Sequence, residues 1–289
     1  MTPVNNPVRI VECPRDAMQG IHEFIPTDTK TAYLNQLLKV GFDVLDFGSF
    51  VSPKAIPQLR DTAEVLAGLD LNGYTGKLLA IIANERGAQD ALHFPEIHYL
   101  GFPFSISETF QRRNTNSGIE ESFHTVAKIQ EQCVKNGKEL LIYFSMGFGN
   151  PYGDPWNQDV LYAWSEKMRG LGIRNISLAD TVGVACPETI STLFNGLIPA
   201  FPELVFGAHF HSHPAHWEEK VEAAYASGCR SFDSAIRGFG GCPMAEDSLV
   251  GNIATENLIG YLDRHQVPLT LHRDALQAAI LKSSAVFPV

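Results

Sequence analysis

The feature that most limits the fold of this chain is a regular alternation of short apolar segments with helical patterns. Eight segments of six to nine residues are rich in β-branched and aromatic side chains. They cover residues 8–13, 43–49, 77–84, 97–105, 139–146, 175–181, 205–211 and 231–236. Near-continuous apolar character, rather than strict polar–apolar alternation, is typical of parallel strands that are covered on both faces.

Amphipathic helical patterns fill most of the gaps between these segments. Each is followed by a glycine, which is favoured where a helix ends in left-handed backbone. These helices are expected to end at Gly41, Gly137, Gly172 and Gly228. The weakest helical pattern is the short segment "ERGAQDALHFPE" between the third and fourth strands. From about Val267 one further pattern, with Leu276, Ala279 and Ile280 at helical spacing, predicts a C-terminal helix on the outside of the fold.

Eight strands with helical crossovers predict an α/β fold, a (β/α)₈ TIM barrel with a C-terminal helical extension. We expect a single catalytic domain over residues 1–289, with a core of about 8–262 and a helical tail of about 267–289. A doubly wound open sheet is the alternative. It is less favoured because no glycine-rich dinucleotide turn follows the first strand.

Charge and cysteine content exclude several classes of protein. The net charge of −10, with no basic run, makes a nucleic-acid partner a poor expectation. An anionic small substrate would also be repelled, so it would need local positive groups or a metal. The five cysteines are scattered and form no CxxC motif, which favours a reducing compartment. With neither a signal peptide nor a long apolar stretch in the sequence, we expect a cytoplasmic protein without a membrane partner.

Polar residues collect where the predicted strands end, which is where the active site of a barrel lies. Arg15 and Asp16 follow the first strand, and His209 and His211 end the seventh. The remaining candidates are Asp46, Ser49, Ser177 and Asp180 on strands two and six, and Cys242 and Asn252 in the glycine-rich segment "GFGGCPMAEDSLVGN". Ser49 and Ser177 are predicted to bind substrate.

His209 and His211 indicate a metal site. Residues two apart on a strand share a face, so both imidazoles could reach one divalent cation. The alternative is one histidine satisfied in the core and one facing solvent. Asp16 and Asn252 add oxygen donors at the same rim, although each alone would suit a helix cap or a turn. Cys242 alone would most often be a small buried apolar residue.

Four segments resemble 3-hydroxy-3-methylglutaryl-CoA lyase, a member of the metal-dependent barrel superfamily of aldolase-type lyases and Claisen condensing enzymes. They are "RIVECPRDAMQG", "GSFVSPKAIPQLRDTAEVL", "SLADTVGVACPETI" and "FGGCPMAEDSLVGNIATENL". The similarity runs from about Val8 to Leu262. The "SFVSPK…PQ" segment and the cysteine loop are specific to the lyase branch.

The resemblance implies Mg²⁺ or Mn²⁺ held by four ligands, with Arg15 facing the substrate carbonyl, Cys242 as the active-site loop cysteine and Asp180 near the reacting centre. The implied metal ligands are Asp16, His209, His211 and Asn252. Three residues stay open as the group that takes the hydroxyl proton, namely His209, Asp180 and Asp46. Because members of this family are usually dimers, the resemblance also implies a homodimer.

The implied reaction cleaves 3-hydroxy-3-methylglutaryl-CoA into acetoacetate and acetyl-CoA by retro-Claisen chemistry, as in leucine degradation and ketone-body formation. A related aldolase or condensing enzyme acting on another acyl-CoA or 2-keto acid is the alternative, and a non-catalytic acyl-CoA-binding barrel is a remote one. The chain departs from the family at Ala17-Met18, where glycine-leucine is usual, at Asp46 for glutamate, and at Ser212 for aspartate. These departures leave the acyl-CoA preference open.

Overall fold

The structure is a computed structural model that describes residues 7–241 and 250–287. Eight parallel strands form its centre, and all eight fall within the apolar segments identified from the sequence or one residue beyond them. They are β1 (Arg9–Glu12), β2 (Val44–Ser49), β3 (Lys77–Ile81), β4 (Ile97–Ser105), β5 (Glu139–Ser145), β6 (Asn175–Asp180), β7 (Val205–Ser212) and β8 (Ser231–Ser234). Each strand pairs with the next, and β8 pairs with β1. The sheet therefore closes on itself, which confirms the (β/α)₈ barrel.

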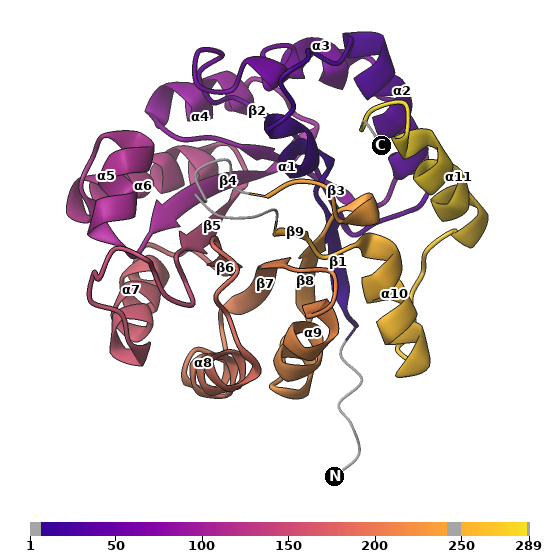
Figure 1. Cartoon of the computed structure of the whole chain (residues 1–289). Helices are drawn as coiled ribbons and strands as arrows, with labels where there is room; N and C mark the ends of the chain where they lie inside the picture. The colour runs from indigo at the N-terminus through magenta and orange to yellow at the C-terminus, as the bar shows by residue number, and fades with distance from the viewer. Residues whose placement is uncertain (1–6, 242–249, 288–289) are drawn as a thin grey trace.

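The helices lie around the barrel as a ring, apart from the short first helix, which lies inside the ring over the barrel (Figure 1). They are α1 (Pro14–Gln19), α2 (Thr27–Leu38), α3 (Thr62–Ala67), α4 (Glu85–Leu92), α5 (Glu108–Thr115), α6 (Ile119–Lys135), α7 (Gln158–Gly170), α8 (Pro187–Ala200), α9 (Trp217–Ala226), α10 (Thr255–Arg264) and α11 (Arg273–Ser283), with short 3₁₀ helices η1 (Pro57–Leu59) and η2 (Ile236–Gly238). The predicted C-terminal helix is α11, which packs on α2.

Four helices end two or three residues before the glycines expected from the sequence. Backbone φ is +83° at Gly41, +65° at Gly137, +80° at Gly172 and +91° at Gly228, a region that side chains disfavour. The weak pattern between β3 and β4 does form a helix, α4, whose first turn is capped by the side chain of Asn84. None of the helices in the described part of the chain has both the length and the apolar character needed to span a membrane.

The inside of the barrel is apolar on one half and polar on the other. Side chains from β1 to β5, among them Val11, Leu79 and Leu141, pack together in the interior. Across from them, Arg9 donates hydrogen bonds to Ser231 (2.9 Å) and Asn175 (3.2 Å), which lie on β8 and β6. Strand β7, which carries the two histidines of the sequence motif, pairs with both β6 and β8.

A ninth strand, β9 (Gly251–Asn252), was not expected from the sequence. It runs antiparallel to the end of β7 and pairs Asn252 with His211. Close packing demands glycine here, because a Cβ on Gly251 would lie 2.2 Å from the carbonyl oxygen of Gly238. This short strand brings the chain that follows β8 back over the barrel mouth.

Candidate active site

Helix α1 brings Arg15 and Asp16 to the barrel mouth. It begins only two residues after β1 ends, with Pro14 at its first position, where the missing N–H costs nothing and the fixed φ suits a helix. Both side chains are buried, at 7% and 5% relative exposure. A charge pair at this depth needs specific partners, because burying an uncompensated charge is costly.

Arg15 finds its partners on β2 and on its own helix. Its Nη2 lies 2.6 Å from Oδ2 of Asp46, and its Nε also donates to that carboxylate at 3.0 Å. Nη1 donates to Asp16 (3.1 Å) and to Gln19 (2.9 Å). Four of the five guanidinium N–H groups are thereby committed within the described part of the chain. One N–H on Nη2 is left for a ligand.

Burial and the charge of Arg15 have opposite effects on the ionisation of Asp46 and Asp16. Burial raises the pKa of Asp46 to about 6, opposed by the charge and hydrogen bonds of Arg15. For Asp16, burial also favours the neutral acid, but Arg15, the two histidines and the Asn252 hydrogen bond together lower the pKa. Both groups are therefore ionised at neutral pH, and Asp16 offers a carboxylate oxygen to a cation.

Hydrogen bonds fix the tautomer of both histidines. Nδ1 of His209 lies 3.0 Å from Oδ2 of Asp233, and Nδ1 of His211 lies 3.1 Å from the carbonyl oxygen of Thr181. Carboxylate and carbonyl oxygens only accept, so Nδ1 carries the proton in each ring. Nε2 is then the atom of each ring that is left for a ligand, and Nε2 of His211 is buried without a hydrogen-bond partner within the described residues. Burial disfavours the charged form of His209, but the hydrogen bond and charge of Asp233 raise its pKa. Burial, together with the charge of His209, lowers the pKa of His211, which favours the neutral ring.

Asp16, His209 and His211 present one ligand atom each within 4.8 Å of one another. Asn252 adjoins this group: its Nδ2 donates to Oδ2 of Asp16 (2.7 Å) and to the carbonyl oxygen of Phe239 (2.9 Å). A buried, unpartnered imidazole nitrogen beside a carboxylate is costly unless something binds it. These residues fit a divalent cation with mixed nitrogen and oxygen ligands.

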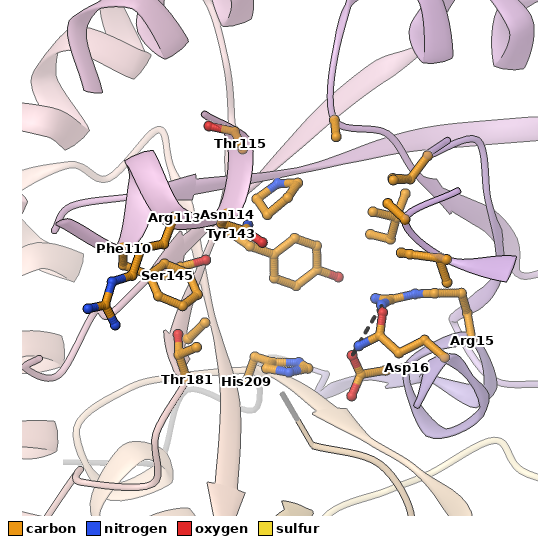
Figure 2. Close-up of a pocket in the computed structure, with 18 of the residues that line it drawn as sticks. Arg15, Asp16, Phe110, Arg113, Asn114, Thr115, Tyr143, Ser145, Thr181 and His209 are labelled. Atoms are coloured by element: carbon orange, nitrogen blue, oxygen red, sulfur yellow. Dashed lines mark hydrogen bonds and ion pairs between the residues drawn. The ribbon is translucent and has the colours of Figure 1, made fainter. Parts of the chain in front are cut away.

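The cluster lies at the edge of a cavity of about 410 Å³. Figure 2 shows Arg15 and Asp16 on one side of it, Phe110 and Arg113 on the other, and the Tyr143 ring between them. The Tyr143 hydroxyl has no hydrogen-bond partner within the part of the chain described. Residues 51, 55 and 56 of the "SFVSPK…PQ" segment also line the cavity.

Some predicted site residues lie outside the cavity wall. Asp46 is fully buried and contacts Arg15 directly, so it supports the guanidinium from behind. Asp180 is buried on the far face of β6, where its Oδ1 accepts from the Ala185 N–H (3.0 Å) and its Oδ2 from Lys220 (2.7 Å). Its neighbours Ala179 and Thr181 line the cavity instead.

The two serines predicted to bind substrate are also away from the cavity wall. Ser49 Oγ accepts a hydrogen bond from the Val51 N–H (3.2 Å), which stabilises the turn after β2. Ser177 is buried in the polar half of the barrel interior, and its hydroxyl has no partner in the described residues. Cys242 lies outside the residues that the structure describes, so its predicted role remains a prediction.

Sequence reasoning missed three residues that shape the site. Asp233 sets the His209 tautomer, Gln19 links the side chains of Arg15 and Asp16, and Arg113 brings a positive charge to the cavity. Gln19 donates to Asp16 at 2.8 Å. Two of them carried a signal: Asp233 interrupts an apolar strand, and Arg113 belongs to an Arg-Arg pair. Gln19 is an ordinary helical residue whose role depends on its neighbours.

Comparisons with known proteins identify the family of the chain. The HMGL-like family model matches residues 8–280. The hydroxymethylglutaryl-CoA lyase YngG of Bacillus subtilis is 33% identical over 267 residues, which cover 92% of this chain and 88% of that protein. The cytoplasmic 3-hydroxy-3-methylglutaryl-CoA lyase of Rattus norvegicus is 33% identical over 264 residues, covering 89% of this chain and 74% of that one.

Solved structures show the same likeness. An HMG-CoA lyase from Acinetobacter baumannii, solved with coenzyme A and 3-methylmalate, superimposes with a TM-score of 0.90 at 33% identity. The match covers 99% of this chain and 93% of that one. The family match over most of the chain, these relatives and the shared barrel together place the protein: it belongs to the HMGL-like family, among the hydroxymethylglutaryl-CoA lyases, and is a carbon–carbon lyase.

Proposed function

We propose that the chain cleaves 3-hydroxy-3-methylglutaryl-CoA into acetoacetate and acetyl-CoA, and that it needs a divalent metal to do so. The observation that carries this proposal is the buried cluster of Asp16, His209 and His211 beside Arg15 at one cavity. A retro-Claisen cleavage must remove a proton from a tertiary alcohol and hold the charge of the departing enolate. The cluster and the guanidinium are suited to these two tasks.

Asp16, His209, His211 and the amide oxygen of Asn252 would hold the metal, with Mg²⁺ or Mn²⁺ favoured by the mixed ligand set and the family. When bound, such a cation lowers the pKa of a coordinated hydroxyl and offsets the negative charge of the substrate. The second contribution matters here because the chain carries a net charge of −10.

Arg15 would stabilise the enolate oxygen. Its fifth N–H has no acceptor among the residues that the structure describes, and the guanidinium is held in place by Asp46 from behind and by Gln19 from the side. Asp46 and Asp16 raise the pKa of Arg15 further although burial opposes it, so this donor is always charged. A fixed, charged donor in a partly dry site stabilises developing negative charge without reorganisation.

Two other groups would bind the substrate. Burial raises the pKa of Tyr143 well above its usual range, so its hydroxyl stays protonated and can donate to a substrate oxygen in the cavity. Arg113 is exposed at the other side of the cavity, where it can attract an anionic group of the acyl-CoA. Cys242 is proposed as the group that protonates the enolate carbon, from its place in the loop that resembles the lyase loop.

A coupled acetoacetate assay tests the function. The chain is treated with a chelator, and then Mg²⁺ or Mn²⁺ is added back. We expect cleavage of 3-hydroxy-3-methylglutaryl-CoA that is lost on chelation and restored by either metal. Activity that is indifferent to chelation would contradict the metal proposal. Turnover of a 2-keto acid instead would favour a related aldolase. The homodimer and the cytoplasmic location also remain proposals.

A further inference from the structure

Lys220 on α9 is a buried lysine whose ammonium group makes three hydrogen bonds. It is only 4% exposed, and Nζ donates to Oδ2 of Asp180 (2.7 Å), to the carbonyl oxygen of His211 (2.9 Å) and to that of Gly183 (3.1 Å). An ammonium group has three N–H donors, so each has an acceptor. The lysine is therefore held in one place rather than free to move toward a ligand.

Asp180 is committed to the same network. One carboxylate oxygen accepts from Lys220 and the other from the Ala185 N–H, and the side chain is 1% exposed. Successive residues of a strand point to opposite faces. Because Ala179 and Thr181 line the cavity, Asp180 lies on the outer face of β6, toward the surrounding helices. Neither oxygen is available to a substrate in the cavity.

The pair reaches the metal cluster through His211. Lys220 donates a hydrogen bond to the backbone carbonyl of His211. The ring of His211 donates from Nδ1 to the backbone carbonyl of Thr181, the residue after Asp180. One contact therefore holds the backbone of His211, and the other holds its imidazole ring. Its Nε2 then lies 3.9 Å from Oδ2 of Asp16.

We propose that Lys220 and Asp180 form a positioning pair that holds His211 toward the metal, and that Asp180 takes no part in proton transfer. The proposal rests on the metal site proposed above. It assigns a role to Lys220, which no motif indicated, and it removes Asp180 from the candidates for the general base.

Lys220 and Asp180 form an ion pair, and substitutions of its two members test the proposed positioning role. Removing one partner leaves an uncompensated buried charge, which is strongly destabilising, whereas replacing both by neutral groups of similar size is often tolerated. A catalytic Asp180 would behave differently, because neutralising its partner could not restore its chemistry. Lys220→Met, Asp180→Asn and the double variant therefore separate positioning from proton transfer. Asparagine keeps an oxygen for the Ala185 N–H.

Three measurements are made on the full chain: the urea midpoint without metal, Mn²⁺ affinity by calorimetry, and kcat. Each single variant is expected to lower the midpoint and to weaken Mn²⁺ binding by about 10- to 100-fold, the usual effect of losing a group that orients a metal ligand. The double variant is expected to recover most of the midpoint, because no uncompensated charge is left, and to have a kcat at saturating Mn²⁺ near that of the unaltered chain. Its Mn²⁺ affinity should stay as low as that of Lys220→Met, because methionine donates nothing to the His211 carbonyl.

The buried pair of Lys30 and Asp61 is the matched control. Its charges are 2.7 Å apart, and the hydrogen-bond acceptors of Lys30 belong to no predicted metal ligand. Lys30→Met should lower the midpoint and leave Mn²⁺ affinity unchanged. Equal loss of affinity in Lys30→Met and Lys220→Met would overturn the specific role.

Two further outcomes would also overturn the proposal. Single variants that bind Mn²⁺ as tightly as the unaltered chain would show that the pair does not position His211. A double variant whose kcat at saturating Mn²⁺ stays as low as that of Asp180→Asn would return Asp180 to the chemistry. If the unaltered chain binds Mn²⁺ but cleaves no 3-hydroxy-3-methylglutaryl-CoA, the proposed function fails, and the midpoint and affinity still decide the role of the pair.

Discussion

Nε2 of His211 lies 3.9 Å from Oδ2 of Asp16, and this buried nitrogen has no hydrogen-bond partner in the described part of the chain. The two residues are far apart in sequence, on β7 and on the helix after β1. A folded protein seldom leaves such an acceptor unsatisfied, because its desolvation costs about 1–3 kcal/mol. The relationship points to a ligand between them, and a divalent cation is the ligand that both atoms would share.

His211→Leu tests this relationship. The substitution removes the unpartnered Nε2 but also the hydrogen bond from Nδ1 to the Thr181 carbonyl, so we expect the free energy of unfolding of the metal-free chain to fall by only about 1 kcal/mol. Mn²⁺ affinity by calorimetry should fall by at least about 100-fold, since a ligand is lost. The control is His216→Leu, at an exposed histidine that contacts Glu219. Tight Mn²⁺ binding by His211→Leu would remove this histidine from the site.

Arg15 and Asp46 form a second buried pair at the site, and here the expected result is the opposite of that for Lys220 and Asp180. Arg15→Gln leaves Asp46 and Asp16 without their cation, so stability should fall by about 3–5 kcal/mol. Loss of the donor should lower kcat by about 10²- to 10³-fold. Arg15→Gln/Asp46→Asn should recover part of the stability in urea unfolding, since only Asp16 then lacks its cation, but not kcat. Recovery of turnover in that double variant would show that Arg15 only supports the structure.

Arg113 offers a test of substrate attraction with a matched neighbour. Arg113 lines the cavity, whereas Arg112 on the same helix is paired with Glu108 at 2.7 Å. A surface charge near an anionic group contributes roughly 1 kcal/mol in water. Arg113→Ala should therefore raise KM about fivefold with little change in kcat, and high salt should diminish the effect. Arg112→Ala should leave KM unchanged. Equal effects of the two variants would argue against a specific contact.

Glu12 predicts a pH dependence of stability. It is fully buried at the end of β1, where it accepts hydrogen bonds from the Ile236 N–H (2.9 Å) and Thr255 Oγ1 (2.5 Å). Burial raises its pKa from 4.5 to about 8, against the effect of these hydrogen bonds. The folded state therefore holds a proton that the unfolded chain loses above about pH 4.5. The stability that the protonated Glu12 carboxyl contributes is fully present below about pH 4.5 and is lost as the pH rises to about 8.

Glu12→Gln measures that contribution. Between pH 5.5 and 7.5, unfolding in urea should show the unaltered chain losing about 1.4 kcal/mol per pH unit more than Glu12→Gln does. Glu64→Gln, an exposed position on α3, should follow the unaltered chain. Parallel pH curves for Glu12→Gln and the unaltered chain would mean that Glu12 does not hold its proton in this range.

Local patterns determined the barrel and the position of the site. Strands and helices follow periodicities that are read within a few residues, so all eight strands and the glycine-terminated helices could be predicted from the sequence. The placement of Arg15, Asp16, His209 and His211 at strand ends follows from the same patterns, because the chemistry of a barrel lies at those ends. Asn252 was predicted as a ligand, but the strand β9 that places it opposite His211 was not.

Only the tertiary structure decided which polar groups meet. Arg15 pairs with Asp46 31 residues away, Lys220 with Asp180 40 residues away, and Asn252 contacts Asp16 across 236 residues. Such contacts depend on barrel closure and strand register, which no local pattern carries. The sequence could therefore name Asp180 as a polar residue at a strand end, but not show that both of its oxygens are turned away from the cavity. The role of a buried charged residue such as Asp180 depends on its hydrogen-bond partners, and these are set by the tertiary structure.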